Sequence, residues 1–297
     1  MSTFGTMKDR LSLISAGHKT ESEIGDLINR VHQEECENYD WHDRFKKDLI
    51  ASVAVKTDGT ISLAQDSAAV IGSSTAFAST DVGSYFRPGS DEVLIEISSF
   101  TSTVAITLAT SWPGSALSGS SYELFPLFYS LPSDCYEVLN ISRQGVPVIK
   151  KSRTEFHIWD PSRQSSASTS LFWAPAGVDS SGYMRVEFWP HNTDAVLYDL
   201  EYKAGHTDMT EDNDRPLVPA SVVENKALHD VCMAEFLRTG DDRWKKTADV
   251  FYSRYLKELE EAKKTDARRF GLISQIRDDL TAQPFDHDFM AKHDIIG

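Results

Sequence analysis

Two groups of side chains have residue types that bind metal ions in other proteins. His32, Cys36 and His42 offer nitrogen and sulfur ligands to zinc, with His32 and Cys36 one helical turn apart. A structural zinc site usually has four ligands at tighter paired spacing, and no fourth ligand stands near these three. We therefore predict that these side chains pack inside the protein and hold no metal.

The second group is the acidic segment from Asp208 to Asp214, whose carboxylates suit a hard cation such as calcium. It lacks the Asp-x-Asp-x-Asp-Gly spacing of a calcium loop, and Pro216 follows it closely. We therefore predict a solvated turn at this place. The acids and histidines near the end of the chain, including Asp286 and His293, are interpreted as polar spacers between apolar residues.

The short motifs of common enzymes are absent from the sequence. It has no Gly-x-x-x-x-Gly-Lys-Ser/Thr phosphate loop, no Gly-x-Ser-x-Gly turn, no Gly-x-Gly-x-x-Gly and no His-Glu-x-x-His. The paired carboxylates of a cell-wall hydrolase need no local motif, so that class stays open without any residue in its favour. We predict that the chain is not an enzyme and needs no cofactor.

The tryptophans of the middle region allow two interpretations. Trp159, Trp173 and Trp189 could form a platform that stacks on sugars or bases. Aromatic residues at strand spacing also bury large areas in cores and where subunits meet. We favour burial and keep the binding platform as the alternative.

The helices and strands that position these residues can be predicted from the composition, which divides the chain into three zones. A charged zone reaches about residue 50, a zone rich in Ser, Thr and Gly reaches about residue 220, and a second charged zone follows. In the first zone, the capping box Thr20-Glu-Ser-Glu23 and the apolar spacing after it predict a helix from about Thr20. We expect this helix to break near Asn38 and to resume from Trp41 through Ile50.

In the middle zone the apolar period changes to two, first in residues 53–55 and 61–63, with Asp58-Gly59 between them as a hairpin signal. Further short strands bounded by Gly, Pro or Ser predict an antiparallel sandwich or barrel. In the last zone, Ser221 with Glu224 predicts a capped helix, Gly240 ends it, and Asp241 with Asp242 begins another.

These patterns predict an α+β fold. Helices from the two ends of the chain would form a bundle, and a large antiparallel β-sandwich or barrel region would be inserted between them. The helical domain would comprise residues 1–50 and 221–265, and the β-rich domain residues 51–220, with 51–135 and 136–220 as two candidate subregions. Residues 266–297 would form an extended C-terminal tail whose scattered apolar residues suggest docking on a partner.

The charge balance limits the classes of partner. The chain has 45 acidic and 30 basic residues and a formal net charge of −15, which argues against gripping nucleic acid through its phosphates. No apolar run approaches the ~18 to 20 residues that cross a bilayer, and the N-terminus lacks the regions of a signal peptide. The three cysteines are far apart and are predicted to be buried thiols. We expect assembly in the host cytoplasm and no membrane partner.

The order of several segments along residues 20 to 260 resembles the head-to-tail connector (adaptor) proteins of tailed bacteriophages, including tail tubular and gatekeeper proteins. These segments follow the capped helix at Thr20 and are Ala69–Phe77, Asp81–Gly83, Leu131–Asp134, Arg185–Pro190, Leu197–Tyr202, Met209–Pro219 and Gly240–Asp242.

The resemblance implies a structural protein of the virion neck. Its subunits would form a dodecameric ring that joins the portal protein to the tail or nozzle proteins and surrounds the DNA exit channel, through which double-stranded DNA passes without specific binding. The helices would form the ring, and the C-terminal segment would dock on the portal. From their apolar character we assign this docking to Phe270, Ile273, Ile276, Phe285 and Phe289. The alternative function is a virion receptor- or carbohydrate-binding β module, against which the flanking helices count.

Overall fold

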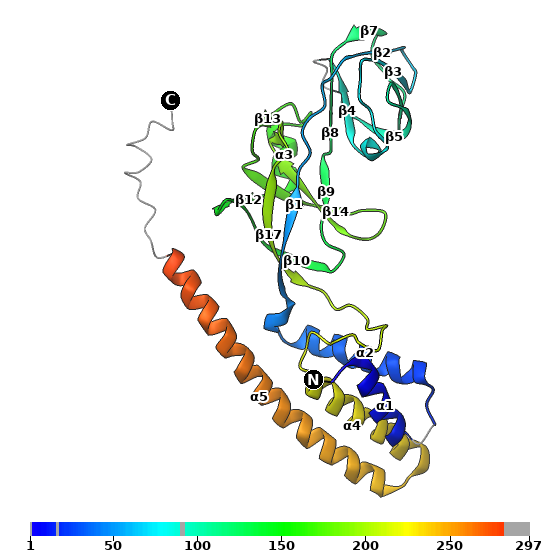
Figure 1. Ribbon diagram of the computed structural model, residues 1–297, viewed down its shortest axis with the longest axis vertical. Coiled ribbons are helices and arrows are strands. Elements are labelled where there is room, and N and C mark those ends of the chain that lie inside the picture. The colour runs from blue at the N-terminus through cyan, green and yellow to red at the C-terminus, as the bar shows by residue number, and fades with distance from the viewer. Residues whose placement is uncertain (1, 16–17, 90–92, 282–297) are drawn as a thin grey trace. The chain divides into compact units, whose positions relative to one another are not determined.

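The computed structural model describes residues 2–15, 18–89 and 93–281 (Figure 1). The chain divides into two compact units, which we call the helical unit (Met1–Phe45 with Gly205–Gly297) and the β-rich unit (Lys46–Ala204). The mixed α+β composition predicted from the sequence is confirmed, with helices at both ends of the chain and strands between them.

The helical unit is built around one apolar core. Its elements are α1 (Phe4–Ile14), α2 (Glu21–Asn38), the 3-10 helix η1 (His42–Arg44), α4 (Ala220–Thr239) and α5 (Asp242–Thr281). Side chains spaced three and four residues apart on these α-helices are buried together, and they include Met7, Leu11, Ile24, Ile28, Val31, Val223, Ala227, Val231 and Tyr255. None of the helices in the described ranges is long and apolar enough to cross a membrane.

The helix ends show which local signals decide structure. Thr20 caps α2 as predicted, because its hydroxyl accepts the Glu23 N–H at 3.3 Å while the Glu23 carboxylate accepts the Thr20 N–H at 2.7 Å. Gly240 ends α4 in the left-handed conformation with φ 70°, also as predicted. The capping box predicted at Ser221 is wrong, since α4 begins after Pro219 and the Ser221 hydroxyl donates to Glu258 instead.

Two longer predictions in the helical zones need correction. The segment expected to be helical up to Ile50 contains only η1 and then strand β1 (Phe45–Ala51), which lies beside β17 (Leu197–Ala204) in a sheet. Pairing with a strand so distant in sequence overrides local helix propensity. The tail expected to be extended is helical as far as Thr281, because α5 continues without a proline until Pro284 follows it in the sequence.

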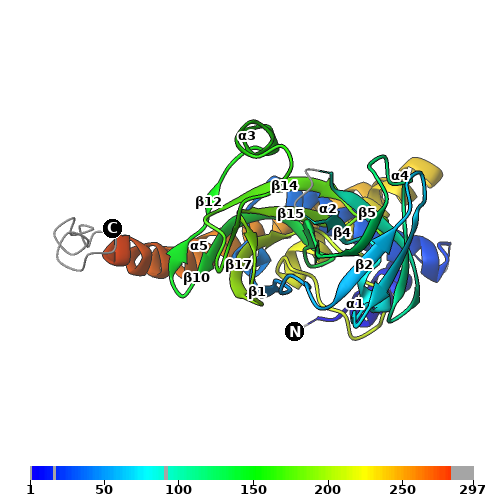
Figure 2. The ribbon, with the colours of Figure 1, turned by 90° about the horizontal axis from the view of Figure 1, so that it is seen from above.

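The β-rich unit contains two four-stranded sheets, in the orders β1-β17-β10-β11 and β12-β14-β15-β9. Their bounds are β9 (Phe128–Ser130), β10 (Cys135–Arg143), β11 (Val146–Pro147), β12 (Ile149–Lys150), β14 (Phe172–Val178) and β15 (Met184–Trp189). Side chains of both sheets share one core, as Ile141 and Leu200 of the first sheet pack with Trp173 and Phe188 of the second. This part of the unit is therefore a sandwich. Helix α3 (Arg153–Trp159) stands to one side of its strands (Figure 2).

The second part of the β-rich unit is a seven-stranded antiparallel sheet in the order β7-β2-β3-β6-β5-β4-β8. Its strands are β2 (Thr60–Leu63), β3 (Ala69–Ser73), β4 (Tyr85–Pro88), β5 (Ile95–Ser102), β6 (Ala105–Leu108), β7 (Leu117–Ser120) and β8 (Tyr122–Phe125), with η2 (Ser79–Asp81) before β4. Only Ser121 separates β7 from β8, although they lie at opposite ends of the strand order. The sheet must therefore curl until its two edges meet, and Phe86, Ile97, Ile106 and Trp112 are buried inside it.

Two details of the β region differ from expectation. The hairpin predicted at Asp58-Gly59 is wrong, because β2 pairs with β3 and β7 and residues 53–55 belong to no strand. Gly59 has φ 80° and lies so close to the chain at Ser73 that a Cβ would stand 2.3 Å from the Ser73 carbonyl oxygen. The pairs β12 with β14 and β13 (Ser166–Ala167) with β16 (His191–Asn192) are parallel, so the predicted antiparallel sandwich or barrel is not antiparallel throughout.

Candidate docking surfaces of the helical unit

The candidate zinc ligands have structural roles in the helical unit. His32 is buried on α2, where its Nε2 accepts the Leu217 N–H at 3.0 Å and its ring contacts His206 at 4.8 Å between centroids. Burial lowers the pKa of His32 to about 3, so the ring is neutral and able to accept this bond. Cys36 is buried as well, and burial raises its thiol pKa to about 11. Within the described ranges, no three His, Cys, Asp or Glu side chains gather as a metal site.

The acidic segment before Pro216 is a turn that holds the start of α1. The Asp214 carboxylate accepts the N–H groups of Thr210 and Glu211 at 2.8 and 2.9 Å, and these bonds lower its pKa. The carbonyls of Asp212 and Asp214 accept the N–H groups at the beginning of α1, which have no partner within that helix. Asp212 also forms an ion pair with Lys8 at 2.8 Å. The segment therefore has a structural role, because these contacts attach it to α1.

The tryptophans of the β-rich unit divide between its core and its surface. Trp173 is buried in the sandwich, as the favoured interpretation predicted. Trp159 is 44% exposed and packs at the edge of a cluster with Phe172 and Trp189, at 5.6 and 5.3 Å between ring centroids. The Lys151 ammonium lies 5.3 Å from the Trp159 ring. Trp159 is therefore a surface aromatic residue and not a core residue.

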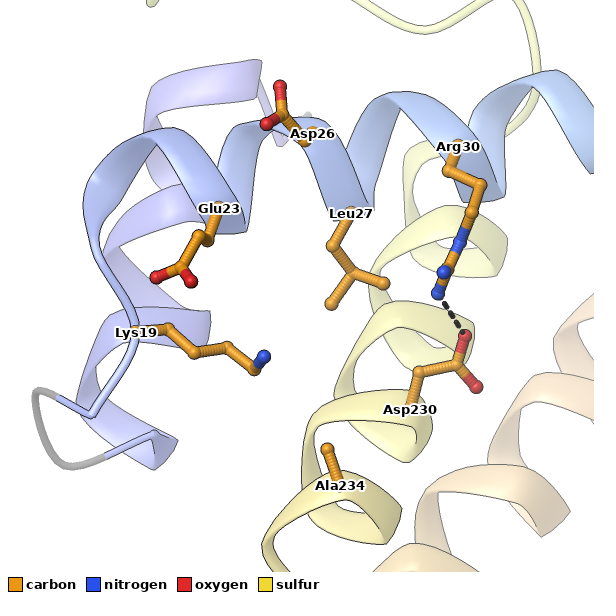
Figure 3. Close-up of a pocket in the computed structure, with 7 residues that line it drawn as sticks. All are labelled: Lys19, Glu23, Asp26, Leu27, Arg30, Asp230 and Ala234. Carbon is orange, nitrogen blue, oxygen red and sulfur yellow. Dashed lines mark ion pairs between the residues drawn. The ribbon is translucent and has the colours of Figure 1, made fainter.

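A groove opens between α2 and α4 in the helical unit (Figure 3). It has a volume of about 420 Å³ and is lined by Lys19, Glu23, Asp26, Leu27, Arg30, Asp230 and Ala234. In Figure 3 Leu27 points down from α2 toward α4, and Arg30 reaches across to Asp230 at one end, at 3.5 Å. The groove therefore has an apolar floor with charged groups along its rim.

The solvent face of α2 beside this groove is acidic. Its exposed carboxylates are Glu21, Glu23, Asp26, Glu34 and Glu37, and Arg30 is the only lysine or arginine of the helix. Glu23 is used by the N-terminal cap, and Glu34 lies 3.8 Å from Arg30. In the described part of the chain no ion pair holds Asp26. This face therefore carries a negative charge that the helix does not balance.

Helix α5 has an inner face that is fixed in the unit. Ala248 and Tyr255 are buried, and the Tyr255 hydroxyl donates to Glu35 of α2 at 2.7 Å. About three helical turns further along α5, the Asp266 carboxylate accepts the His42 N–H at 3.0 and 3.1 Å. Burial and the neighbouring Glu35 carboxylate raise the pKa of Tyr255. These contacts fix which side of α5 faces solvent.

The opposite side of α5 is exposed, and we call it the outer stripe. It consists of Lys246, Val250, Ser253, Arg254 and Lys257. These positions recur at three and four residues, so they lie on one helix face. Val250 is 50% exposed, and no ion pair among the described residues holds the three basic side chains of the stripe. The outer stripe is thus a mainly basic surface with an apolar side chain in it, and the exposed Asp249 lies beside it.

The residues predicted to dock on a partner lie elsewhere. Phe270, Ile273 and Ile276 belong to the last part of α5, and Phe285 and Phe289 lie outside the described residues. Sequence reasoning missed the groove and the outer stripe. The one-sided acidity of α2 and the spacing of bases in residues 246–257 are the signals that could have found them.

The chain matches the model of a known protein family. The model of the family described as SU10 adaptor protein matches residues 2–277 of the chain, which cover the whole β-rich unit and most of the helical unit. No curated protein matches the chain.

Proposed function

Because the chain belongs to the SU10 adaptor protein family, a family of phage head-to-tail adaptors, we propose that it forms a ring that joins the portal to the tail. The observation that carries this proposal is the extent of the family match, which covers residues 2–277. In this role the chain is a structural protein of the virion neck, and its subunits surround the channel through which DNA leaves the head.

The proposed ring is a dodecamer, since a subunit layer that follows a twelvefold portal takes its symmetry. A subunit whose two lateral faces differ makes head-to-tail contacts, which must close into a ring or run on as a filament. The helical unit would form the ring, and the β-rich unit would carry a surface toward tail or nozzle proteins. A net charge of −15 repels phosphates, so double-stranded DNA would pass without specific binding.

Docking on the portal is assigned to residues 266–297. Phe270, Ile273 and Ile276 recur at helical spacing on the part of α5 that follows its contacts with η1, and Phe285 and Phe289 continue the apolar series in the sequence. Apolar side chains at this spacing are typical of a helix that lies in a groove of a partner. A truncation must keep Asp266, because its carboxylate holds the His42 N–H within the helical unit.

The test mixes the full chain with the portal protein of the same genome and examines the mixture by negative-stain imaging and native mass measurement. We expect the portal ring to gain a layer of about one subunit per portal subunit. A chain that ends at Arg268 should keep its fold by circular dichroism but leave the portal bare. A bare portal with the full chain would refute the adaptor role, and a coated portal with the shortened chain would refute docking through the C-terminal segment.

A further inference from the structure

We propose that neighbouring copies of this chain contact each other by seating the outer stripe of α5 of one copy on the groove between α2 and α4 of the next. This inference rests on the proposed function, since it assigns the lateral contact of that ring to two surfaces of the helical unit. The occupant of the groove is therefore a second copy of this chain.

The two surfaces are separate parts of one unit and cannot meet within one copy. The inner face of α5 is held against α2 by the Tyr255 bond to Glu35, and α4 packs beside it. The outer stripe lies on the opposite side of the same helix and points away from both. A head-to-tail contact between two different surfaces is the kind that repeats around a closed ring.

Charge favours this pairing. The outer stripe offers Lys246, Arg254 and Lys257, which no ion pair in the described ranges holds. The exposed side of α2 offers Asp26, which is not in such a pair either, and Glu34, which lies 3.8 Å from Arg30. Lys19 and Arg30 also line the groove, but acids outnumber them, since four further acidic residues lie nearby or at the rim. Those are Glu21, Glu23, Glu37 and Asp230. In a chain with a net charge of −15, two random surfaces of neighbouring copies would repel each other. A basic helix face against an acidic one removes that repulsion at the contact and fixes its orientation.

The shapes of the two surfaces also agree. The groove of about 420 Å³ has Leu27 as its apolar floor and the small side chain of Ala234 opposite, which leaves room for one side chain from a neighbour. Val250 is half exposed at the middle of the outer stripe, between the charged residues that precede and follow it. Seating Val250 over Leu27 would bury apolar surface on both copies and bring the flanking bases to the acidic rim.

The first test reverses charges in the full chain. Arg254→Glu with Lys257→Glu should weaken assembly on the portal about tenfold, and Asp26→Lys with Glu34→Lys should do the same. The quadruple variant restores opposite charges across the contact, so it should recover most of the loss. Lys150→Glu, an exposed lysine of the β-rich unit, is the matched control and should assemble like the wild type. Thermal melting checks that each variant is folded.

The second test maps the contact by cross-linking. Cys36, Cys135 and Cys232 are buried, so cysteines introduced at Ser253 and Ala234 can be joined selectively by a short bis-maleimide. The double variant on the portal should give a ladder of covalent oligomers, and each single variant should give none. A wild-type chain that leaves the portal bare refutes the proposed function and this contact with it. A coated portal without a ladder, or with coating unaffected by both charge reversals, refutes this contact alone.

Discussion

Glu187 is a fully buried carboxylate that joins α3 to the sandwich of the β-rich unit. Its Oε1 accepts the Arg163 Nε–H at 2.5 Å, and its Oε2 accepts the Arg153 Nε–H at 2.9 Å. Arg163 is buried as well and donates to the carbonyls of Phe156 and Asp160, at 3.3 and 2.5 Å. The carboxylate is therefore the counter-ion of a guanidinium that is out of contact with water.

We expect Glu187→Gln to destabilise the β-rich unit by about 3 to 5 kcal/mol. The amide keeps the shape of the side chain but leaves the buried Arg163 charge without its counter-ion, and breaking a buried pair in this way has that cost. Since 1 kcal/mol shifts the melting temperature of a unit of this size by about 2 to 4 °C, the transition should fall by roughly 10 °C. Arg153→Met is the matched control. It removes the partner that is 37% exposed, and its loss should stay at or below about 1 kcal/mol.

Differential scanning calorimetry of the full chain measures both variants, and tryptophan fluorescence assigns the transition. Trp159 and Trp189 lie in the aromatic cluster beside this pair, and Trp189 donates from Nε1 to Asp160 at 3.2 Å, so they report the β-rich unit. A loss below about 1 kcal/mol for Glu187→Gln would show that the buried charge finds another partner or water. Equal losses for Glu187→Gln and Arg153→Met would refute the argument from burial.

Three further changes test other contacts. Thr20→Ala removes the cap of α2 and should cost the helical unit about 1 kcal/mol in chemical denaturation. Tyr255→Phe removes the hydroxyl that donates to the buried Glu35 carboxylate, and it should lower the free energy of unfolding by about 1.5 to 3 kcal/mol in the same assay. An unchanged free energy of unfolding would show that water replaces this hydrogen bond. Burial lowers the pKa of His191 from 6.5 to about 4 in the folded chain. As the pH falls, the ring is therefore protonated in the unfolded chain before it is protonated in the folded one, and stability is lost between pH 6.5 and about 4. His191→Phe, which keeps a ring against Phe125, should flatten this slope in melting temperatures at pH 7 and pH 5, and an unchanged slope would exclude His191 as a source.

Local signals in the sequence predicted elements where one or two residues decide the backbone. Thr20 and Gly240 are of this kind, because a cap and a left-handed glycine act on the chain next to them. The segment Phe45–Ala51 and the turn at Asp58-Gly59 were predicted wrongly because distant strands decide them. The closing of the seven-stranded sheet depends on which strands pair, and periodicity does not carry that information.

The candidate surfaces were out of reach of sequence reasoning for a related reason. The acidity of α2 can be seen in the sequence, but the groove forms only where α2 and α4 come together and Leu27 and Ala234 line the same space. The apolar residues of α5 do not all face inward, since Tyr252 and Leu256 are 42% and 47% exposed. The helix turns these two away from Ala248 and Tyr255, and only the packing of α4 and α2 shows which side is inner.

The length of α5 links the two proposals. A helix of 40 residues is about 60 Å long, twice the length of α4 with its 20 residues. Glu258 already meets Ser221 near the beginning of α4, so the part of α5 that follows runs past α4. Its last contact described here is Asp266 with η1. Residues 269–281 continue α5 beyond this contact, and they are the part that we assign to the portal. One helix would then contact its own unit, the neighbouring copy and the portal along its length. A chain that ends at Arg268 and carries Ser253→Cys with Ala234→Cys should therefore fail to bind the portal. It should still form the cross-link between copies at high protein concentration. Loss of both portal binding and the cross-link would contradict separate contacts.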